Sequence, residues 1–210
     1  MKLSKTIFAA LIAAMAMSCA EQPEEQTVME EKNQVIETIM ARRSIRKYQD
    51  RPVSRDTLNK IMECGINAPN GQNKQSWEVR IVDNPEVIKK LTDLYVKDNP
   101  KEAENPNFQN MFRNAPTVAF IANDTTFAYS PVDCGLMAEN MILSAWSMGI
   151  GSCCLGSVIP VMNSGAAKPY LERLNLPEGY HLQVAIAFGY PAGENPEAPE
   201  RDYSKAYYIE

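Results

Sequence analysis

The sequence predicts an α+β fold for a single globular domain, in preference to a doubly wound parallel sheet. Of the 210 residues, 45% are hydrophobic and 22% are charged, which is ordinary for one domain with its own core. Some segments repeat apolar residues at helical spacing, and others alternate apolar and polar residues as strands do. These segments do not follow the strict strand–helix–strand order that builds a parallel sheet, which favours the α+β class.

The overall charge and the histidine content narrow the classes of function. The formal net charge is −5 and the pI is close to 5.1, so general attraction to nucleic acid is not expected. The sequence holds one histidine, His181. A hydrolase with a Ser-His or Cys-His pair is therefore disfavoured, and so is a histidine-based metal centre.

The N-terminus predicts export. Residues 1–18 have the layout of a secretory signal peptide, with two lysines, an uninterrupted apolar stretch at residues 7–17 and a small residue before Cys19. The apolar stretch is too short to cross a bilayer permanently. We therefore expect the signal peptide to be removed.

The end of this signal bears on localisation. Ser18-Cys19-Ala20 resembles the lipobox of bacterial lipoproteins, which implies a lipidated Cys19, a periplasmic or cell-surface location and membrane contact only through the lipid anchor. The alternative is a signal peptide that is discarded together with its cysteine. Residues 19–31 are rich in acids and predict a solvated tether, which leaves residues 32–210 as the folded domain.

Two helices are predicted before the first strand. Apolar residues at helical spacing predict a helix over residues 28–41, directly before the arginine-rich segment at 42–55. Ser54 is typical of an N-cap and predicts a second helix that stops before Pro69. Residues 68–76, with the sequence APNGQNKQS, are then expected to form a loop.

The central part of the chain predicts two strands and one helix. Residues 77–82 alternate apolar and polar side chains, which indicates a strand. Residues 84–95 begin with Asn-Pro, a typical helix start, and continue at helical spacing. Residues 97–113 are polar, interrupted by proline and expected to be irregular. Residues 116–122, with the sequence PTVAFIA, predict a buried strand.

A long apolar helix and a last strand are predicted in the C-terminal half. Ser130, Pro131 and Asp133 resemble a capping box at the start of a helix that ends near Met148. This helix is apolar nearly all round, so it should be buried on more than one side. Alternating residues at 182–188 predict a strand, and a proline-rich tail follows it.

Apart from Cys19, the sequence holds four cysteines, and their spacing matches no zinc-binding pattern. We interpret them as small, buried packing residues, with a disulfide between the two adjacent cysteines as the alternative. They are Cys64, Cys134, Cys153 and Cys154.

Three separated stretches carry a family resemblance: RRSIRKY at 42–48, APNGQNKQSW at 68–77, and DCGLMAENMILSAWSMGIGSCCLG at 133–156. In this order they resemble the nitroreductase family of FMN-dependent oxidoreductases. The resemblance runs from about Val35 to the C-terminus. It implies a central mixed or antiparallel sheet flanked by helices, and a homodimer with the flavin between subunits and the long apolar helix in the interface. Burial of that helix within a monomer is the alternative.

The resemblance assigns the arginine segment to the phosphate and ribityl chain of FMN. Guanidinium groups and a hydroxyl suit a phosphate dianion, because their hydrogen bonds to it are charge-assisted. In the family a basic residue near the C-terminus returns to the phosphate. The residues implied are Arg42, Arg43, Ser44, Arg46 and Arg201, with Lys205 as a weaker candidate and with Arg51 and Arg55 interpreted as solvated surface.

Two further groups are implied at the isoalloxazine ring. The loop motif should reach the flavin of the partner subunit through Pro69, Asn70, Gly71 and Asn73, although Asn70 and Ser76 depart from the family pattern. Asparagine amides can both donate to and accept from the pyrimidine edge of the ring. Backbone N–H groups of Leu155 and Gly156 should face the ring and stabilise charge on the reduced flavin.

The resemblance also implies the reaction. Reduced NAD(P)H would deliver hydride to N5 of FMN in a ping-pong cycle, and a nitroaromatic, a quinone or a similar small acceptor would then be reduced; the protein supplies position and electrostatics. Export separates the chain from cytoplasmic NAD(P)H. The alternative is therefore an exported flavin-binding lipoprotein that relays or senses electrons with a partner other than a nicotinamide. A third and less favoured hypothesis is a catalytically inactive binding module that has kept the fold.

Overall fold

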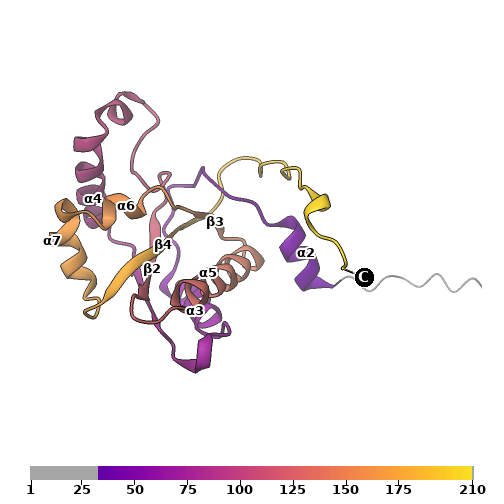
Figure 1. Cartoon of the computed structure of the whole chain (residues 1–210). Helices are drawn as coiled ribbons and strands as arrows, with labels where there is room; N and C mark the ends of the chain where they lie inside the picture. Colours follow the sequence, from indigo (N-terminus) through magenta and orange to yellow (C-terminus); the bar gives the residue numbers. More distant parts are fainter. Residues whose placement is uncertain (1–32, 210) are drawn as a thin grey trace, which may run out of the picture. The chain divides into compact units, whose positions relative to one another are not determined.

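The computed structural model of the chain describes residues 33–209 (Figure 1). The predicted signal peptide, the lipidation of Cys19 and the acidic tether lie outside these residues. The described residues from Gln34 onward form one compact unit, and the first predicted helix is described from Gln34 to Ala41.

The described elements alternate without a regular rhythm along the chain. The sheet is built from β1 (Trp77–Val82), β2 (Thr117–Asp124), β3 (Gly151–Cys154) and β4 (Tyr180–Gly189). The helices are α2 (Gln34–Ala41), α3 (Arg55–Ile66), α4 (Pro85–Asp98), α5 (Ser130–Ser147), α6 (Ile159–Met162) and α7 (Lys168–Leu171).

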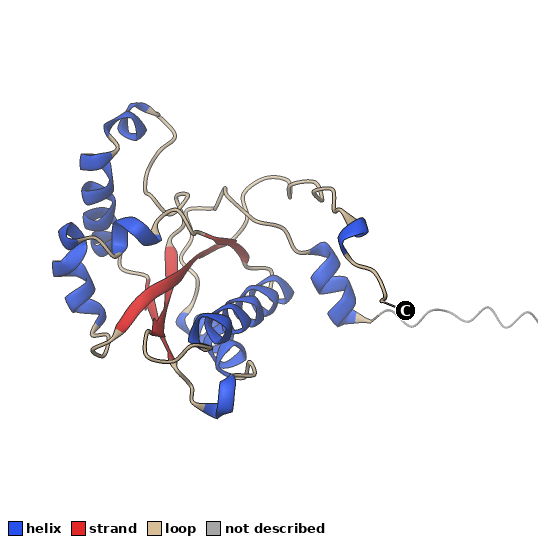
Figure 2. Ribbon diagram, viewed as in Figure 1, coloured by secondary structure: helices blue, strands red, loops and turns tan. Residues whose placement is uncertain are grey.

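The four strands form one sheet in the order β1-β2-β4-β3, and every neighbouring pair is antiparallel (Figure 2). Of the two predicted arrangements, mixed or antiparallel, the antiparallel one is therefore confirmed for the described strands. The register between β2 and β4 shifts between Ile121 and Ala122. Such an irregularity bends the strands locally and raises their twist.

Helices cover both faces of the sheet, and alternate residues of the central strand serve the two faces. Val118 and Phe120 of β2 join the core under α4 and α6, whereas Ala119 and Ile121 join the core under α3 and α5. Figure 1 shows α3 and α5 side by side, with α4, α6 and α7 on the other side of the sheet. Two cores explain why β2 reads as a continuous apolar run.

Helix starts were predicted with mixed success. Ser54 accepts a hydrogen bond from the backbone N–H of Thr57 at 3.2 Å, and Asn84 accepts one from Glu86 at 2.9 Å, so both predicted caps are confirmed. The capping box at Ser130 is wrong. Ser130 is the first residue of α5, and the preceding Tyr129 makes no side-chain cap. Both polar side chains of this first turn are used in tertiary contacts.

The segment between α4 and β2 is more ordered than predicted. A 3-10 helix spans Pro100–Glu104, and α4 itself continues to Asp98. β3 was not predicted, because GSCC has no alternating apolar pattern, and its pairing with β4 defines it as a strand. α6 and α7 are single short turns that were not predicted either.

The predicted packing role of the cysteines is correct for only some of them. Cys134 and Cys153 are buried, whereas Cys64 is half-buried and Cys154 is exposed. Burial raises the pKa of the Cys134 thiol to about 11, which suits an inert core residue. All four thiols are free, and since neighbouring residues of a strand point to opposite faces, β3 keeps Cys153 and Cys154 apart.

Two negative findings apply to the described residues. Over 33–209, no helix is both long and apolar enough to span a membrane. Within the same range, no group of three or more histidine, cysteine or acidic side chains is arranged to hold a metal ion.

Candidate functional site

The arginine segment lies along the edge of the sheet. The backbone N–H of Ile45 donates to the carbonyl of Ser152 on β3 at 2.8 Å, and Ser44 and Ser152 form a parallel bridge. Ile45 is buried, with 3% of its surface exposed. The segment is thus fixed beside β3 at the edge of the sheet by one isolated bridge, with Arg42 two residues before Ser44 and Arg46 two residues after it.

Close packing beside β3 depends on a glycine. A Cβ atom at Gly151 would lie 2.8 Å from Cγ1 of Ile45, which is closer than side-chain atoms approach one another. Tyr48 holds the other end of the segment, because its hydroxyl donates to the carbonyl of Ile45 at 2.6 Å. Burial raises the pKa of Tyr48 far above its ordinary value, so the hydroxyl stays protonated and remains a donor.

Arg42 is poised to accept an anion. Its Nε lies 3.9 Å from a carboxylate oxygen of Glu139 on α5, which is too far for a hydrogen bond. That Nε is buried and has no hydrogen-bond partner. A buried guanidinium nitrogen without an acceptor is costly, and an anionic group beside it would satisfy it. The segment therefore fits a phosphate.

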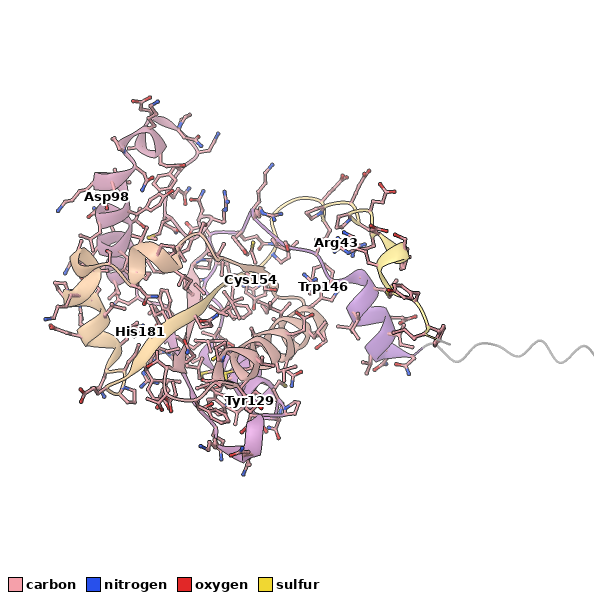
Figure 3. All side chains as sticks on the ribbon, in the orientation of Figure 1. Arg43, Asp98, Tyr129, Trp146, Cys154 and His181 are labelled. Carbon is pink, nitrogen blue, oxygen red and sulfur yellow. The ribbon has the colours of Figure 1, made fainter. Side chains whose placement is uncertain are left out.

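Arg43 is folded back in this structure. One of its terminal nitrogens donates to the carbonyls of Met40 and Arg42, both at 2.8 Å, and Figure 3 shows it beside α2. Arg51 stacks on the ring of Tyr190 at 3.9 Å, and Arg55 is paired with Asp83. The last two arginines therefore have structural partners of their own, and the exposed Arg55 agrees with the surface interpretation.

The turn after β3 corrects one expectation. The N–H of Leu155 already donates to the carbonyl of Ala185 at 2.8 Å, and the Leu155 side chain is buried in the core. This N–H is therefore not available to a cofactor. Gly156 is exposed, and a Cβ placed on it would meet no atom within 4 Å, so it is the member of the pair that a ligand could approach.

The loop at 68–76 adopts a strained backbone. Three of its residues other than glycine have positive φ angles: Gln72 at 56°, Asn73 at 53° and Gln75 at 50°. Such conformations each cost free energy and are concentrated at functional sites. Asn70 closes the loop by accepting from the N–H of Gln75 at 2.9 Å.

Only part of the predicted loop contacts remains open to a ligand. The Asn70 oxygen is used within the loop, and the N–H of Gly71 donates to Asp133 at 2.9 Å. Pro69 and Asn73 are exposed, so Asn73 is the asparagine whose amide faces solvent. Their role at a partner's flavin stays a prediction.

Two residues at the start of α5 anchor this loop, and sequence reasoning misassigned both. The carboxylate of Asp133, 3% exposed, accepts from Gly71 N–H and from the Ser76 hydroxyl at 3.2 Å. Ser130 donates to the carbonyl of Ser76 and accepts from the N–H of Asp124 at 2.9 Å. The signal was the polar pair on an apolar helix, because a buried acid there requires polar partners.

The loop contacts the first turn of α5 at Asp133, whereas Arg42 lies beside Glu139 near the middle of this helix. Figure 3 shows Tyr129, directly before the helix, far from Trp146 and Arg43 near its other end. Asp133 and Glu139 are six residues apart on α5, a rise of about 9 Å. Among the described residues, no hydrogen bond or ion pair joins the loop to the arginine segment of the same chain.

The C-terminal candidates lie in the segment that follows the last strand. Arg201 is exposed there, and Lys205 is paired with Asp202 at 3.6 Å. No hydrogen bond or ion pair joins Arg201 to the arginine segment within residues 33–209. Its return to a phosphate stays a prediction.

The fold and this edge define a class: α+β proteins with helices on both faces of an antiparallel sheet and a basic segment beside its last strand. The model of the nitroreductase family matches residues 39–190. The chain belongs to the nitroreductase family.

Individual relatives agree with this assignment. A proposed NADH dehydrogenase/NAD(P)H nitroreductase of Archaeoglobus fulgidus is 31% identical, over 79% of this chain and 91% of its own. The crystal structure of a nitroreductase with bound FMN from Bacteroides fragilis has a TM-score of 0.75 and 28% identity, covering 85% of this chain and 100% of that one. An FMN-dependent nitroreductase of Clostridium difficile has a TM-score of 0.72 and 31% identity, covering 84% and 99%.

Proposed function

We propose that this protein is an FMN-dependent oxidoreductase that takes hydride from NAD(P)H and reduces a nitroaromatic, a quinone or a similar small acceptor. The observation that carries the proposal is the unpartnered Nε of Arg42 in a basic edge segment, since similar proteins in this family bind FMN. The relatives include an NADPH-dependent FMN reductase of Bacillus subtilis, 25% identical over 80% of this chain. Their names support the donor and the cofactor.

The chain's own residues have binding and orienting roles. Arg42, Ser44 and Arg46 would hold the phosphate and ribityl chain, and the exposed Gly156 would allow close approach of the ring. When bound, FMN supplies the hydride chemistry. The exposed Asn73 amide could donate to a ring edge and accept from it. No histidine or paired acid is needed for this role.

We propose that the working form is a homodimer. Two copies of α5 packed antiparallel would bring each loop to the partner's arginine segment, a contact that the described residues of the loop do not make with the arginines of their own chain. The outward face of α5 supports this arrangement. Val132 is 60% exposed and Leu136 is 41% exposed, and Leu143 continues the same face at helical spacing. These exposed apolar side chains count against the alternative, burial of the helix within a monomer.

We predict that Leu136→Asp converts the dimer to a monomer. A carboxylate placed in each half of an apolar interface has no partner, so the dissociation constant of the dimer should rise at least about a hundredfold. Light scattering after size-exclusion chromatography measures this. The matched control is Lys90→Asp on α4, which adds the same side chain on the other face of the sheet. A dimeric Leu136→Asp protein would place the interface elsewhere.

A spectroscopic experiment tests the proposed reaction. The purified protein should show a flavin absorption band that NADH or NADPH bleaches and a nitroarene restores. Bound flavin that neither nucleotide reduces would instead support the exported electron relay. A protein without flavin, even after incubation with excess FMN, would contradict both.

We further propose that the protein is exported and anchored through Cys19. The lipobox-like Ser18-Cys19-Ala20 supports this proposal. In cells, the protein should incorporate labelled fatty acid. The labelled protein should then be recovered in the membrane fraction. A Cys19→Ala chain that keeps both the label and the membrane fraction would contradict the anchor.

A further inference from the structure

A second basic pocket lies directly beyond Arg46. A cavity of about 310 Å³ is lined by Arg46 and Lys47 from the arginine segment and by Arg113 from the segment before β2. Ser157 and Val158, which follow Gly156, form another part of its wall. The pocket therefore adjoins the turn where the proposed cofactor ring would lie, although Arg46 is the one residue of its lining that the resemblance assigns to the cofactor.

Arg113 is held in a strained conformation. Arg113 and Asn114 have φ angles of 60° and 61°, in the left-handed region that residues other than glycine seldom adopt. The side chain of Asn114 fastens this bend by accepting from the N–H groups of Gln109 and Asn110, at 2.9 and 3.0 Å, and by donating to the carbonyl of Asn107 at 2.7 Å. Positive φ angles at two consecutive residues cost free energy, and the hydrogen bonds of Asn114 stabilise the backbone that carries Arg113 in this conformation.

The pocket has an excess of positive charge. Three cations line it against one carboxylate, that of Glu102, in a chain whose net charge is negative. Neither Lys47 nor Arg113 forms an ion pair with any residue that the structure describes. Arg113 and Arg46 also act electrostatically on the same side chain, the thiol of Cys153. Burial raises the pKa of the Cys153 thiol, and both guanidiniums oppose that rise.

We propose that Arg46, Lys47 and Arg113 form a subsite for a carboxylate or phosphate of the donor or acceptor that docks beside the flavin. The inference rests on the proposed oxidoreductase function and narrows its substrates to anionic ones. Guanidinium groups bind carboxylates and phosphates in the same forked geometry, so both sources share this chemistry. Asn105 and Asn107 line the same cavity and add polar residues to it.

The test compares matched pairs of small molecules that differ in one anionic group. For the carboxylate arm the pair is 4-nitrobenzoate and nitrobenzene; for the phosphate arm it is reduced nicotinamide mononucleotide and reduced nicotinamide riboside. The test variant is Arg113→Asn, because asparagine suits the left-handed backbone at this position. We expect its KM for the charged member of one pair to rise about tenfold, which corresponds to the loss of one charge-assisted hydrogen bond. KM for the neutral member should not change.

Controls separate this pocket from the cofactor site. Arg113→Lys should restore most of the affinity, and Lys90→Gln, an exposed cation on α4, should behave as wild type. Lys47→Gln provides a second variant if Arg113→Asn does not fold. Titration calorimetry with 4-nitrobenzoate and with reduced nicotinamide mononucleotide measures anion binding even in a protein that holds no flavin, so failure of the proposed function would be recognised separately. Equal affinities of wild type and variants for both charged members would overturn the subsite.

Discussion

Replacing Arg42 and Arg46 together by alanine should release FMN while the fold survives. Each arginine is expected to make a charge-assisted hydrogen bond to the cofactor, worth about 1.5–3 kcal/mol, with the lower end suited to partly exposed groups. The dissociation constant for FMN should therefore rise at least about a hundredfold. Fluorescence titration of the apoprotein with FMN measures the change, and circular dichroism reports the fold.

The same segment offers a matched control. Arg55→Ala removes an exposed guanidinium whose partner is Asp83, at 3.0 and 3.1 Å. It should leave FMN affinity unchanged. If the double variant binds FMN as wild type does, the phosphate lies elsewhere and the assignment of the arginine segment is wrong.

Asp133→Ala should have the second largest effect, on stability and on the loop together. Removal of this buried carboxylate leaves the Gly71 N–H and the Ser76 hydroxyl without their acceptor. Each unsatisfied donor costs about 1–3 kcal/mol, so the free energy of unfolding should fall by about 3 kcal/mol. For a domain of this size the melting temperature should drop by about 6–12 °C.

Two variants show whether Asp133 acts through the loop. Asp133→Asn keeps one acceptor oxygen and should recover about half of the lost stability, whereas Asp98→Ala at the exposed end of α4 should cost almost nothing. Chemical denaturation compares all three. Because the loop is expected to reach the partner's flavin, Asp133→Ala should also lose flavin on dialysis at a temperature where it is fully folded. Full retention would limit Asp133 to a role in folding.

Much of the fold follows from local patterns. β1, β2, β4, α3 and α4 begin and end close to their predicted residues, because each has clear periodicity and its ends have local capping or breaking signals. β3 could not be predicted, since Gly151–Cys154 is a strand only through its pairing with β4. The capping box at Ser130 failed for a related reason. A tertiary contact with Ser76 uses the side chain that a local rule assigned to the helix end.

Candidate site residues could be named from the sequence where they lie in one contiguous motif. They were missed where only the fold brings them together. The arginine segment was found from its own residues, and its burial against Gly151 adds the physical reason for its position. Arg113 was missed because it lies in a polar segment without periodicity, and only the fold brings it to the pocket of Arg46. Leu155 was misassigned at its N–H because sheet pairing to Ala185 cannot be read from the turn sequence.

Within the part of the chain that the structure describes, the loop contacts the first turn of α5 and makes no hydrogen bond or ion pair with the arginine segment of its own chain, and this has a consequence for how the protein acquires its coenzyme. If each flavin rests on arginines of one chain and on a loop of the other, cofactor binding and association are thermodynamically linked, and each strengthens the other by the same factor. Dilution would then release the flavin from the protein without any mutation. Excess FMN would keep the two subunits associated at concentrations where the apoprotein dissociates.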